Sequence, residues 1–156
     1  MTSTPAPFRL SHFGLCVSDL ERSLRFYGEG LGFDVAERYE LDSETMPGLD
    51  RALEIGERVT VTSQFIRLGT LGIELLEYST PSPSGAPSAT RAQLGLSHLA
   101  FHVDDVEASV AKLVACGGTV IESTRAELGV PLVFLHDPDG VRIELMQVPA
   151  RPPREG

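Results

Sequence analysis

The pattern of hydrophobic and polar positions occurs twice along the chain, each time in the same order. Each copy opens with apolar and polar residues in alternation, continues with apolar residues at helical spacing, and ends in further alternating segments. In the first opening segment Phe13, Leu15 and Val17 share one face of a strand, and His12 and Gly14 lie on the other. The pattern predicts two units with the element order βαβββ.

The duplication extends to individual residues. Segments 11–21 and 97–107 align without a gap, so His98 stands where His12 stands in the first copy. Self-similarity of this kind indicates that each copy is one supersecondary unit. The fold class expected for the chain is therefore α+β, with two tandem βαβββ modules.

A second correspondence lies near the end of each copy. Glu74 and Glu144 each stand between an isoleucine and a leucine, on the polar side of an apolar alternation. The stretch between histidine and glutamate is longer in the first copy, which predicts an insertion at residues 41–58. This insertion has the length of a flap over a cavity, and a surface loop without function is the alternative.

Local signals place the helices, the strands and the module boundaries. Ser18 with Glu21 and Asp104 with Glu107 resemble capping boxes, so a helix is expected to begin at each pair. The strands expected after the helices are 33–40, 60–68 and 72–78 in the first copy and 119–122, 132–136 and 141–148 in the second. The chain then divides into a first module, a linker, a second module and a flexible tail, at residues 8–79, 80–93, 94–148 and 149–156. The linker and the tail are not expected to carry chemistry.

Charge narrows the classes of partner. The formal net charge is -9, with 22 acidic against 13 basic residues, so nucleic-acid phosphates and anionic membrane surfaces are repelled. No apolar run reaches the roughly 20 residues of a membrane span, and the first ten residues do not resemble a signal peptide. We therefore expect a cytoplasmic protein with a small-molecule partner, and neither a nucleic-acid nor a membrane partner.

Four residues of metal-ligand type fall on the polar faces of the expected strands. A single histidine, or a glutamate in an alternating strand, is by default an ordinary polar residue of a half-buried sheet. Here the same residue type recurs at the same place in both copies, at His12 and His98 and at Glu74 and Glu144. If both sheets curl around one cavity, a divalent cation offsets the cost of burying two carboxylates. Nitrogen and oxygen ligands suit Zn, Ni, Co, Mn or Fe(II), and the sequence does not choose among them.

Together these residues resemble the vicinal oxygen chelate superfamily, which includes glyoxalase I, methylmalonyl-CoA epimerase, extradiol dioxygenases and the fosfomycin and bleomycin resistance proteins. The resemblance covers about residues 8–148 and is carried by LSHFGLCV at 10–17, IELL at 73–76, LSHLAF at 96–101 and FLHDPDG at 134–140, leading into IEL at 143–145. It implies a glyoxalase-like fold in which paired βαβββ modules form a half-closed, barrel-like cavity. It also implies metal ligands at His12, Glu74, His98 and Glu144.

The resemblance further implies a reaction. Members that isomerise have four protein ligands, whereas the extradiol dioxygenases have two histidines and one glutamate, so Glu74 favours a metal-dependent isomerase or lyase of the glyoxalase or epimerase type. A divalent ion stabilises the enolate formed when a proton leaves the carbon next to a carbonyl, and Glu144 or Glu74 would carry that proton. A ring-cleaving dioxygenase and a non-catalytic binding or resistance protein remain as alternatives.

Strand parity also selects residues that would line the substrate cavity. Arg142, His102, Tyr78 and Met146 lie on the ligand-bearing faces of their strands. A guanidinium at Arg142 is suited to gripping a carboxylate or a phosphate. The expected assembly is a homodimer, and whether the modules pair within or between chains is left open.

Overall fold

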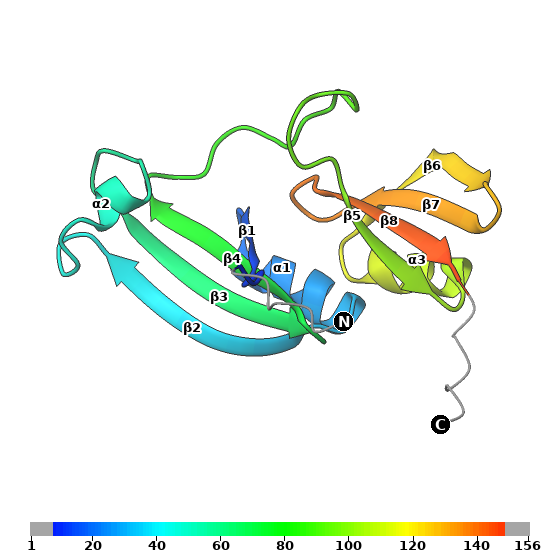
Figure 1. Ribbon diagram of the computed structural model, residues 1–156, viewed down its shortest axis with the longest axis horizontal. Coiled ribbons are helices and arrows are strands. Elements are labelled where there is room, and N and C mark those ends of the chain that lie inside the picture. The colour runs from blue at the N-terminus through cyan, green and yellow to red at the C-terminus, as the bar shows by residue number, and fades with distance from the viewer. Residues whose placement is uncertain (1–7, 149–156) are drawn as a thin grey trace, which may run out of the picture. The chain divides into compact units, whose positions relative to one another are not determined.

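The computed structural model describes residues 8–148, so the predicted tail at 149–156 lies outside the described residues. Figure 1 labels the elements in chain order. Within the described residues the chain forms two compact units, one from residues 8–20 and 33–83 and the other from residues 21–32 and 84–148. Each unit is built around one four-stranded sheet. No helix among the described residues is both long and apolar enough to cross a membrane.

The first sheet contains β1 (Phe13–Cys16), β2 (Asp34–Asp42), β3 (Thr60–Leu68) and β4 (Leu71–Thr80) in the spatial order β1-β4-β3-β2. Strand β1 is parallel to β4, and the other pairs are antiparallel. The apolar alternates of the central strands, Ile66, Ile73 and Leu75, are fully buried. A short helix, α2 (Leu49–Ala52), lies within the insertion between β2 and β3.

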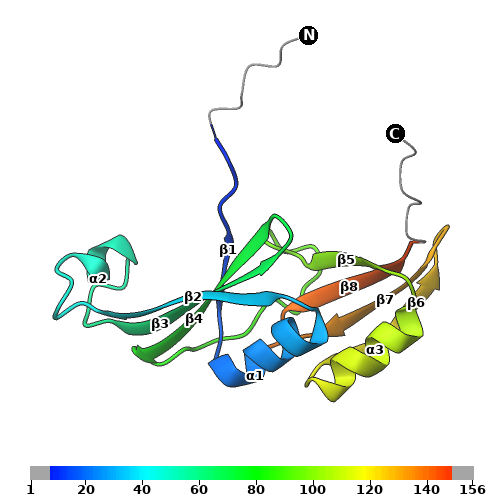
Figure 2. The ribbon, with the colours of Figure 1, turned by 90° about the horizontal axis from the view of Figure 1, so that it is seen from below.

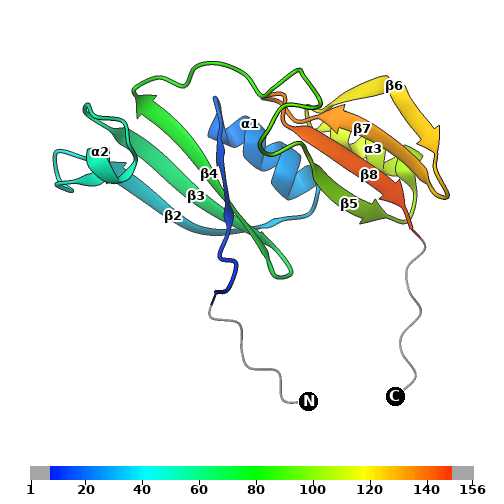
Figure 3. The same cartoon turned by 45° about the horizontal axis from the view of Figure 1, so that its top comes forward.

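The second sheet contains β5 (Leu99–Val103), β6 (Thr119–Glu127), β7 (Pro131–His136) and β8 (Arg142–Gln147) in the equivalent order β5-β8-β7-β6. Strand β8 lies between β5 and β7 (Figure 3), and β5 runs parallel to it. Helix α3 (Val106–Ala115) covers one face of this sheet (Figure 2). The predicted order of strand, helix and three strands is therefore present twice, with the same sheet topology.

The helices begin differently from the predicted capping boxes. Helix α3 starts one residue later than expected, since the carboxylate of Asp105, and not that of Asp104, accepts the N–H of Ala108 at 2.9 Å. Its first N–H, on Val106, donates to the side chain of Gln147 on β8 at 3.0 Å. The sequence pattern contained no signal for this acceptor because it comes from a strand distant in the chain.

The first copy has the same arrangement. The first N–H of α1 (Leu20–Leu24), on Leu20, donates to the carboxylate of Glu77 on β4 at 2.8 Å. Glu77 and Gln147 occupy equivalent positions of the two last strands, three residues after Glu74 and Glu144. The first N–H groups of a helix have no acceptor within the helix. In both copies a side chain of the last strand therefore supplies one.

The helix of the first copy packs within the second unit. Helix α1 continues as a π-helical turn, η1 (Arg25–Gly30), in which Phe26 and Tyr27 are fully buried. The hydroxyl of Tyr27 donates to the buried carboxylate of Asp137 at 2.8 Å. At Gly118 an added Cβ would lie only 2.8 Å from the ring of Phe26, so glycine permits this close approach. Amphipathic spacing predicts that a helix buries one face, but it does not identify the surface that covers that face.

The buried tyrosine generates a prediction about alkaline stability. Burial, and then the negative charge of Asp137, raise the pKa of the Tyr27 phenol well above its ordinary value of 10.0. A phenol whose pKa is raised by folding stabilises the protein fully below its unfolded pKa, and this stability is lost as the pH rises above about 10. We expect the free energy of unfolding of the wild type to fall in that range relative to Tyr27→Phe, with a limiting slope of about 1.4 kcal/mol per pH unit. Urea titrations at several pH values measure this free energy of unfolding and its slope. Tyr39→Phe, at a half-exposed phenol, is the control, and equal slopes for wild type and Tyr27→Phe would contradict the assignment.

Candidate metal-binding pairs

The first unit brings two of the predicted ligands into contact. His12 directly precedes β1, and the register pairs Gly14 with Glu74 on β4. This parallel pairing places Nε2 of His12 3.2 Å from Oε2 of Glu74. The side chains are 34% and 19% exposed, so both are held by the fold while remaining accessible to a small ligand.

The second unit repeats this pair. Ala100 is paired with Glu144, as Gly14 is with Glu74, and His98 directly precedes β5. Nε2 of His98 lies 3.1 Å from Oε2 of Glu144, and the side chains are 32% and 14% exposed. The predicted equivalence of the two histidines and of the two glutamates therefore holds in the local geometry of each unit.

A serine orients each imidazole. The hydroxyl of Ser11 is 2.9 Å from Nδ1 of His12, and that of Ser97 is 2.7 Å from Nδ1 of His98. When Nδ1–H donates to the serine oxygen, Nε2 carries the free lone pair and points toward the glutamate. Metal-binding histidines are commonly held in this way by a hydrogen bond to the other ring nitrogen.

An aromatic ring further restricts each imidazole. Phe65 is paired with Glu74 across β3 and β4, and Phe134 with Glu144 across β7 and β8. The ring of Phe65 meets the imidazole of His12 edge to face at 5.1 Å, and that of Phe134 meets His98 at 5.4 Å. Such contacts restrict the orientation of the imidazole without adding a polar group to the site.

The donor atoms of each pair suit one shared cation. Two ligands that each lie about 2.1 Å from a cation, at right angles, are themselves about 3.0 Å apart. The nitrogen–oxygen distances of 3.2 and 3.1 Å are close to that separation. The structure thus brings the four predicted ligands together two by two. Within residues 8–148 no group of three or more metal-binding side chains is assembled.

The two glutamates differ in one contact. The buried hydroxyl of Ser63, on β3, donates to Oε1 of Glu74 at 2.5 Å. In the second sheet Leu132 occupies the corresponding place, since it faces Met146 as Ser63 faces Leu76. Glu74 is therefore held at both carboxylate oxygens, whereas no hydroxyl among residues 8–148 holds Glu144 in this way.

The predicted substrate-binding residues lie on the faces that parity assigned to them. Arg142 and Met146 alternate with buried neighbours along β8, on the same side as Glu144. The exposed His102 pairs with Met146. In the first unit, Tyr78 shares the face of Glu74, and burial, Cys16 and Glu74 together raise the pKa of its phenol.

Sequence reasoning missed His136. The sequence left its face unassigned, but the register pairs it with Arg142. Paired residues of antiparallel strands share a face, so His136 lies on the same side as Arg142 and Glu144. The signal that identifies it is the Asp-Pro-Asp-Gly turn at 137–140, which joins the two strands as a hairpin.

The insertion at 41–58 is packed on the face that carries Glu74. Leu49 of α2 joins Val59 and Val61 in a buried cluster, and partly buried residues complete it, namely Leu41, Leu53, Ile55, Leu76 and Tyr78. Val61 is paired with Tyr78, and Leu76 alternates with the buried residues of β4, so the cluster covers this face beyond Glu74. The insertion is therefore anchored next to the first His–Glu pair.

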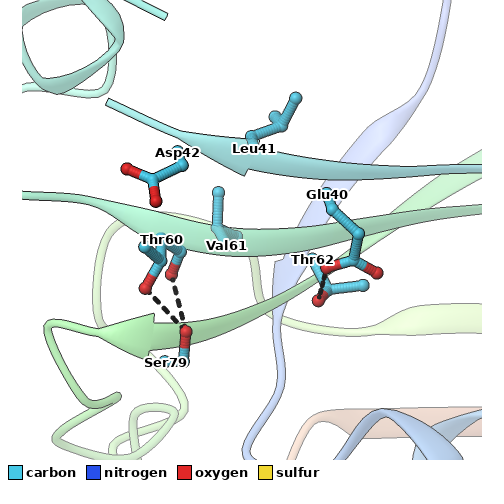
Figure 4. A pocket seen from close by; sticks show the side chains of 7 residues that line it. All are labelled: Glu40, Leu41, Asp42, Thr60, Val61, Thr62 and Ser79. Atoms are coloured by element: carbon cyan, nitrogen blue, oxygen red, sulfur yellow. Dashed lines mark hydrogen bonds between the residues drawn. The ribbon is translucent and has the colours of Figure 1, made fainter. Parts of the chain in front are cut away.

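A shallow pocket lies near the ends of β2, β3 and β4. It encloses about 220 Å³ and is lined by Glu40, Leu41, Asp42, Thr60, Val61, Thr62 and Ser79 (Figure 4). Several of its polar groups bond to one another, as Thr62 does to Glu40 at 2.6 Å. None of the predicted ligands lines it, so we do not assign the site there.

Known proteins resemble this chain in sequence and in fold. Residues 9–145 match the model of the Glyoxalase/Bleomycin resistance protein/Dioxygenase superfamily. An ethylmalonyl-CoA/methylmalonyl-CoA epimerase from Cereibacter sphaeroides is 31% identical over 149 residues, which cover 90% of this chain and 98% of the epimerase.

Two solved structures show the same fold. A glyoxalase family protein from Bacillus cereus is 20% identical with a TM-score of 0.75, over 94% of this chain and 97% of that one. A fosfomycin resistance protein from Listeria monocytogenes, solved with Mn(II), is 17% identical with a TM-score of 0.61, over 90% and 92% of the two chains. The predicted glyoxalase-like fold is confirmed, and a divalent metal is bound by one structural neighbour.

The anchored insertion generates a prediction. Replacing Leu49 by alanine removes most of a buried side chain from the cluster, and we expect a local cost of about 2 kcal/mol. Because the cluster lies at one end of the sheet, residues 43–58 should be cleaved faster in limited proteolysis, with the rest of the unit protected. Met46→Ala, at a half-exposed position of the same insertion, should behave like the wild type. Equal cleavage of all three proteins would show that the cluster does not hold the insertion.

Proposed function

The chain belongs to the Glyoxalase/Bleomycin resistance protein/Dioxygenase superfamily, and from this premise we propose that it is a metal-dependent isomerase or lyase. It transfers a proton next to a carbonyl group of a small substrate. The observation that carries the proposal is the His–Glu pair formed at the same register in both units, each with a serine on the far side of its imidazole. A single pair is an ordinary polar contact, whereas its repetition with the same surroundings supports a shared role.

The cation would be held by His12, Glu74, His98 and Glu144, as the resemblance implies. Two half-buried carboxylates, each against an imidazole, offer negative charge that a divalent cation would offset. When bound, such a cation polarises a carbonyl oxygen and stabilises the negative charge that develops on it. The metal itself is one of Zn, Ni, Co, Mn or Fe(II), since all accept nitrogen and oxygen ligands.

Glu144 is the residue that we propose to move the proton. A base in this role must be able to swing toward the substrate carbon. Ser63 restrains Glu74 through a buried hydrogen bond, whereas the corresponding Leu132 offers no such bond to Glu144. The contact difference thus favours Glu144 over Glu74 as the mobile carboxylate.

The epimerase relative supports this reaction class over the alternatives. This relative is an epimerase, and it is similar to the chain along nearly its whole length. A ring-cleaving dioxygenase would instead consume oxygen when loaded with Fe(II), and a pure binding protein would return its ligand unchanged. Oxygen uptake and product analysis therefore separate these functions.

We also propose that the protein is a homodimer. Four apolar side chains at equivalent positions before β1 and β5 are more than half exposed, namely Phe8, Leu10, Leu94 and Leu96. Exposed apolar side chains repeated in this way support contact with a second copy. Analytical ultracentrifugation at several protein concentrations measures the oligomeric state, and a monomer at all of them would contradict the proposal.

The metal site is tested by elemental analysis of protein purified without a metal-binding tag. We expect about one divalent ion per chain in the wild type. His98→Ala and Glu74→Ala each remove one ligand and should lose most of it, whereas His102→Ala, on the same face as His98, should retain it. Metal content unchanged in His98→Ala and Glu74→Ala would refute the site.

The role of Glu144 is tested by proton exchange. A thioester of 2-methylmalonate in D₂O is the first probe, because the epimerase relative acts on that class. Glu144→Gln should slow exchange of the α-proton about 10²-fold or more, the usual loss on removing a general base. Glu74→Gln, with metal content matched to that of Glu144→Gln, should slow it less. The reverse ranking would transfer the role to Glu74.

A further inference from the structure

The side chains of two arginines and one histidine lie near the hairpin between β7 and β8. Arg142 and His136 face each other across the two strands. The guanidinium of Arg142 lies over the ring of Phe134, with Cζ 3.6 Å from the ring centroid. Stacking of this kind fixes the plane of a guanidinium and leaves the N–H groups at its edge available.

The Nε of Arg142 is buried, and among the described residues no acceptor lies within hydrogen-bonding distance of it. The nearest carboxylate along the same strand face, that of Glu144, already lies against His98. A stacked guanidinium with an unsatisfied buried donor is suited to an incoming oxyanion.

Arg91 comes from the segment before β5, which was predicted to be a linker without chemistry. This segment runs beside the β7–β8 turn (Figures 1 and 3), and a Cβ added at Gly140 of the turn would lie 3.6 Å from Pro87. The charge of Arg91 lowers the pKa of His136, after the effect of burial. The fold therefore holds two arginines near one histidine, and their mutual repulsion is relieved when an anion binds.

We propose that Arg91, His136 and Arg142 form an oxyanion subsite that binds a carboxylate or phosphate group of the substrate. It lies on the same face as Glu144, two residues along β8. A substrate held there presents an anionic group at one end and its reacting carbonyl toward Glu144. The subsite thus restricts the substrate class to anionic carbonyl compounds. This statement about substrates rests on the proposed isomerase or lyase function, whereas binding of the oxyanion itself does not.

The test is isothermal titration of the whole chain, at low ionic strength, with inorganic phosphate in one arm and malonate in the other. We expect saturable binding of at least one probe, and the tighter arm identifies the anionic group. Arg142→Gln and Arg91→Gln should each weaken that binding about tenfold, as expected for loss of a charge-assisted hydrogen bond. Arg91 is exposed, so its variant is expected to fold even if Arg142→Gln does not.

Arg125→Gln is the matched control. Arg125 belongs to the same unit and carries the same charge, but it pairs with Glu107 and Glu122 away from the subsite. Its variant should bind the probe as the wild type does. Absence of saturable binding, or equal weakening in Arg125→Gln, would overturn the subsite.

Metal analysis of the same samples separates the two proposals. Anion binding that depends on Arg91 and Arg142 supports the subsite, even in a protein that holds no metal. Anion binding by a protein that holds no metal would refute the metal-dependent function alone. A metal-loaded protein that does not bind either probe would refute the subsite alone.

Discussion

The candidate site depends on one constraint, the parallel pairing of the first and last strands in each unit. This pairing sets Gly14 against Glu74 and Ala100 against Glu144, so the histidine before each first strand lies beside a glutamate. Parallel neighbours cannot be joined by a tight turn, so a helix and two antiparallel strands intervene. A slip of one residue in this register would turn each glutamate to the apolar face and dissolve the pair.

Duplication preserved this scaffold while the surroundings of the two pairs diverged. The position of Arg142 on β8 corresponds to Gly72 on β4, where an added Cβ would lie 2.8 Å from the carbonyl oxygen of Ser11. The chain before β1 therefore excludes a side chain in the first unit, whereas the second unit carries an arginine there. The insertion and Ser63 are, in turn, features of the first unit. The geometry of the His–Glu pair is common to both halves, and its surroundings differ between them.

Much of this arrangement could be predicted from sequence because it follows from strand periodicity. Alternation alone assigned His12, Glu74 and Arg142 to their faces, and the repeat showed that His98 is equivalent to His12. Features that depend on residues distant in the chain were not accessible in this way. The contacts of Glu77 and Gln147 with the helix starts are examples, as is the packing of Tyr27 against Asp137. His136 was missed because its face depends on pairing across a hairpin, and not on the pattern of β7 alone.

The overall acidity of the chain and its local basic cluster act over different distances. A net charge of -9 repels polyanions, whose many phosphates sample the field of the whole surface. At physiological ionic strength charges are screened over about 8 Å, so a small anion experiences chiefly the groups in direct contact with it. At the proposed subsite these groups are the stacked guanidinium of Arg142, the imidazole of His136 and the nearby Arg91. Charge composition therefore bears on the class of macromolecular partner, whereas the affinity for a small substrate depends on where a few charges are held.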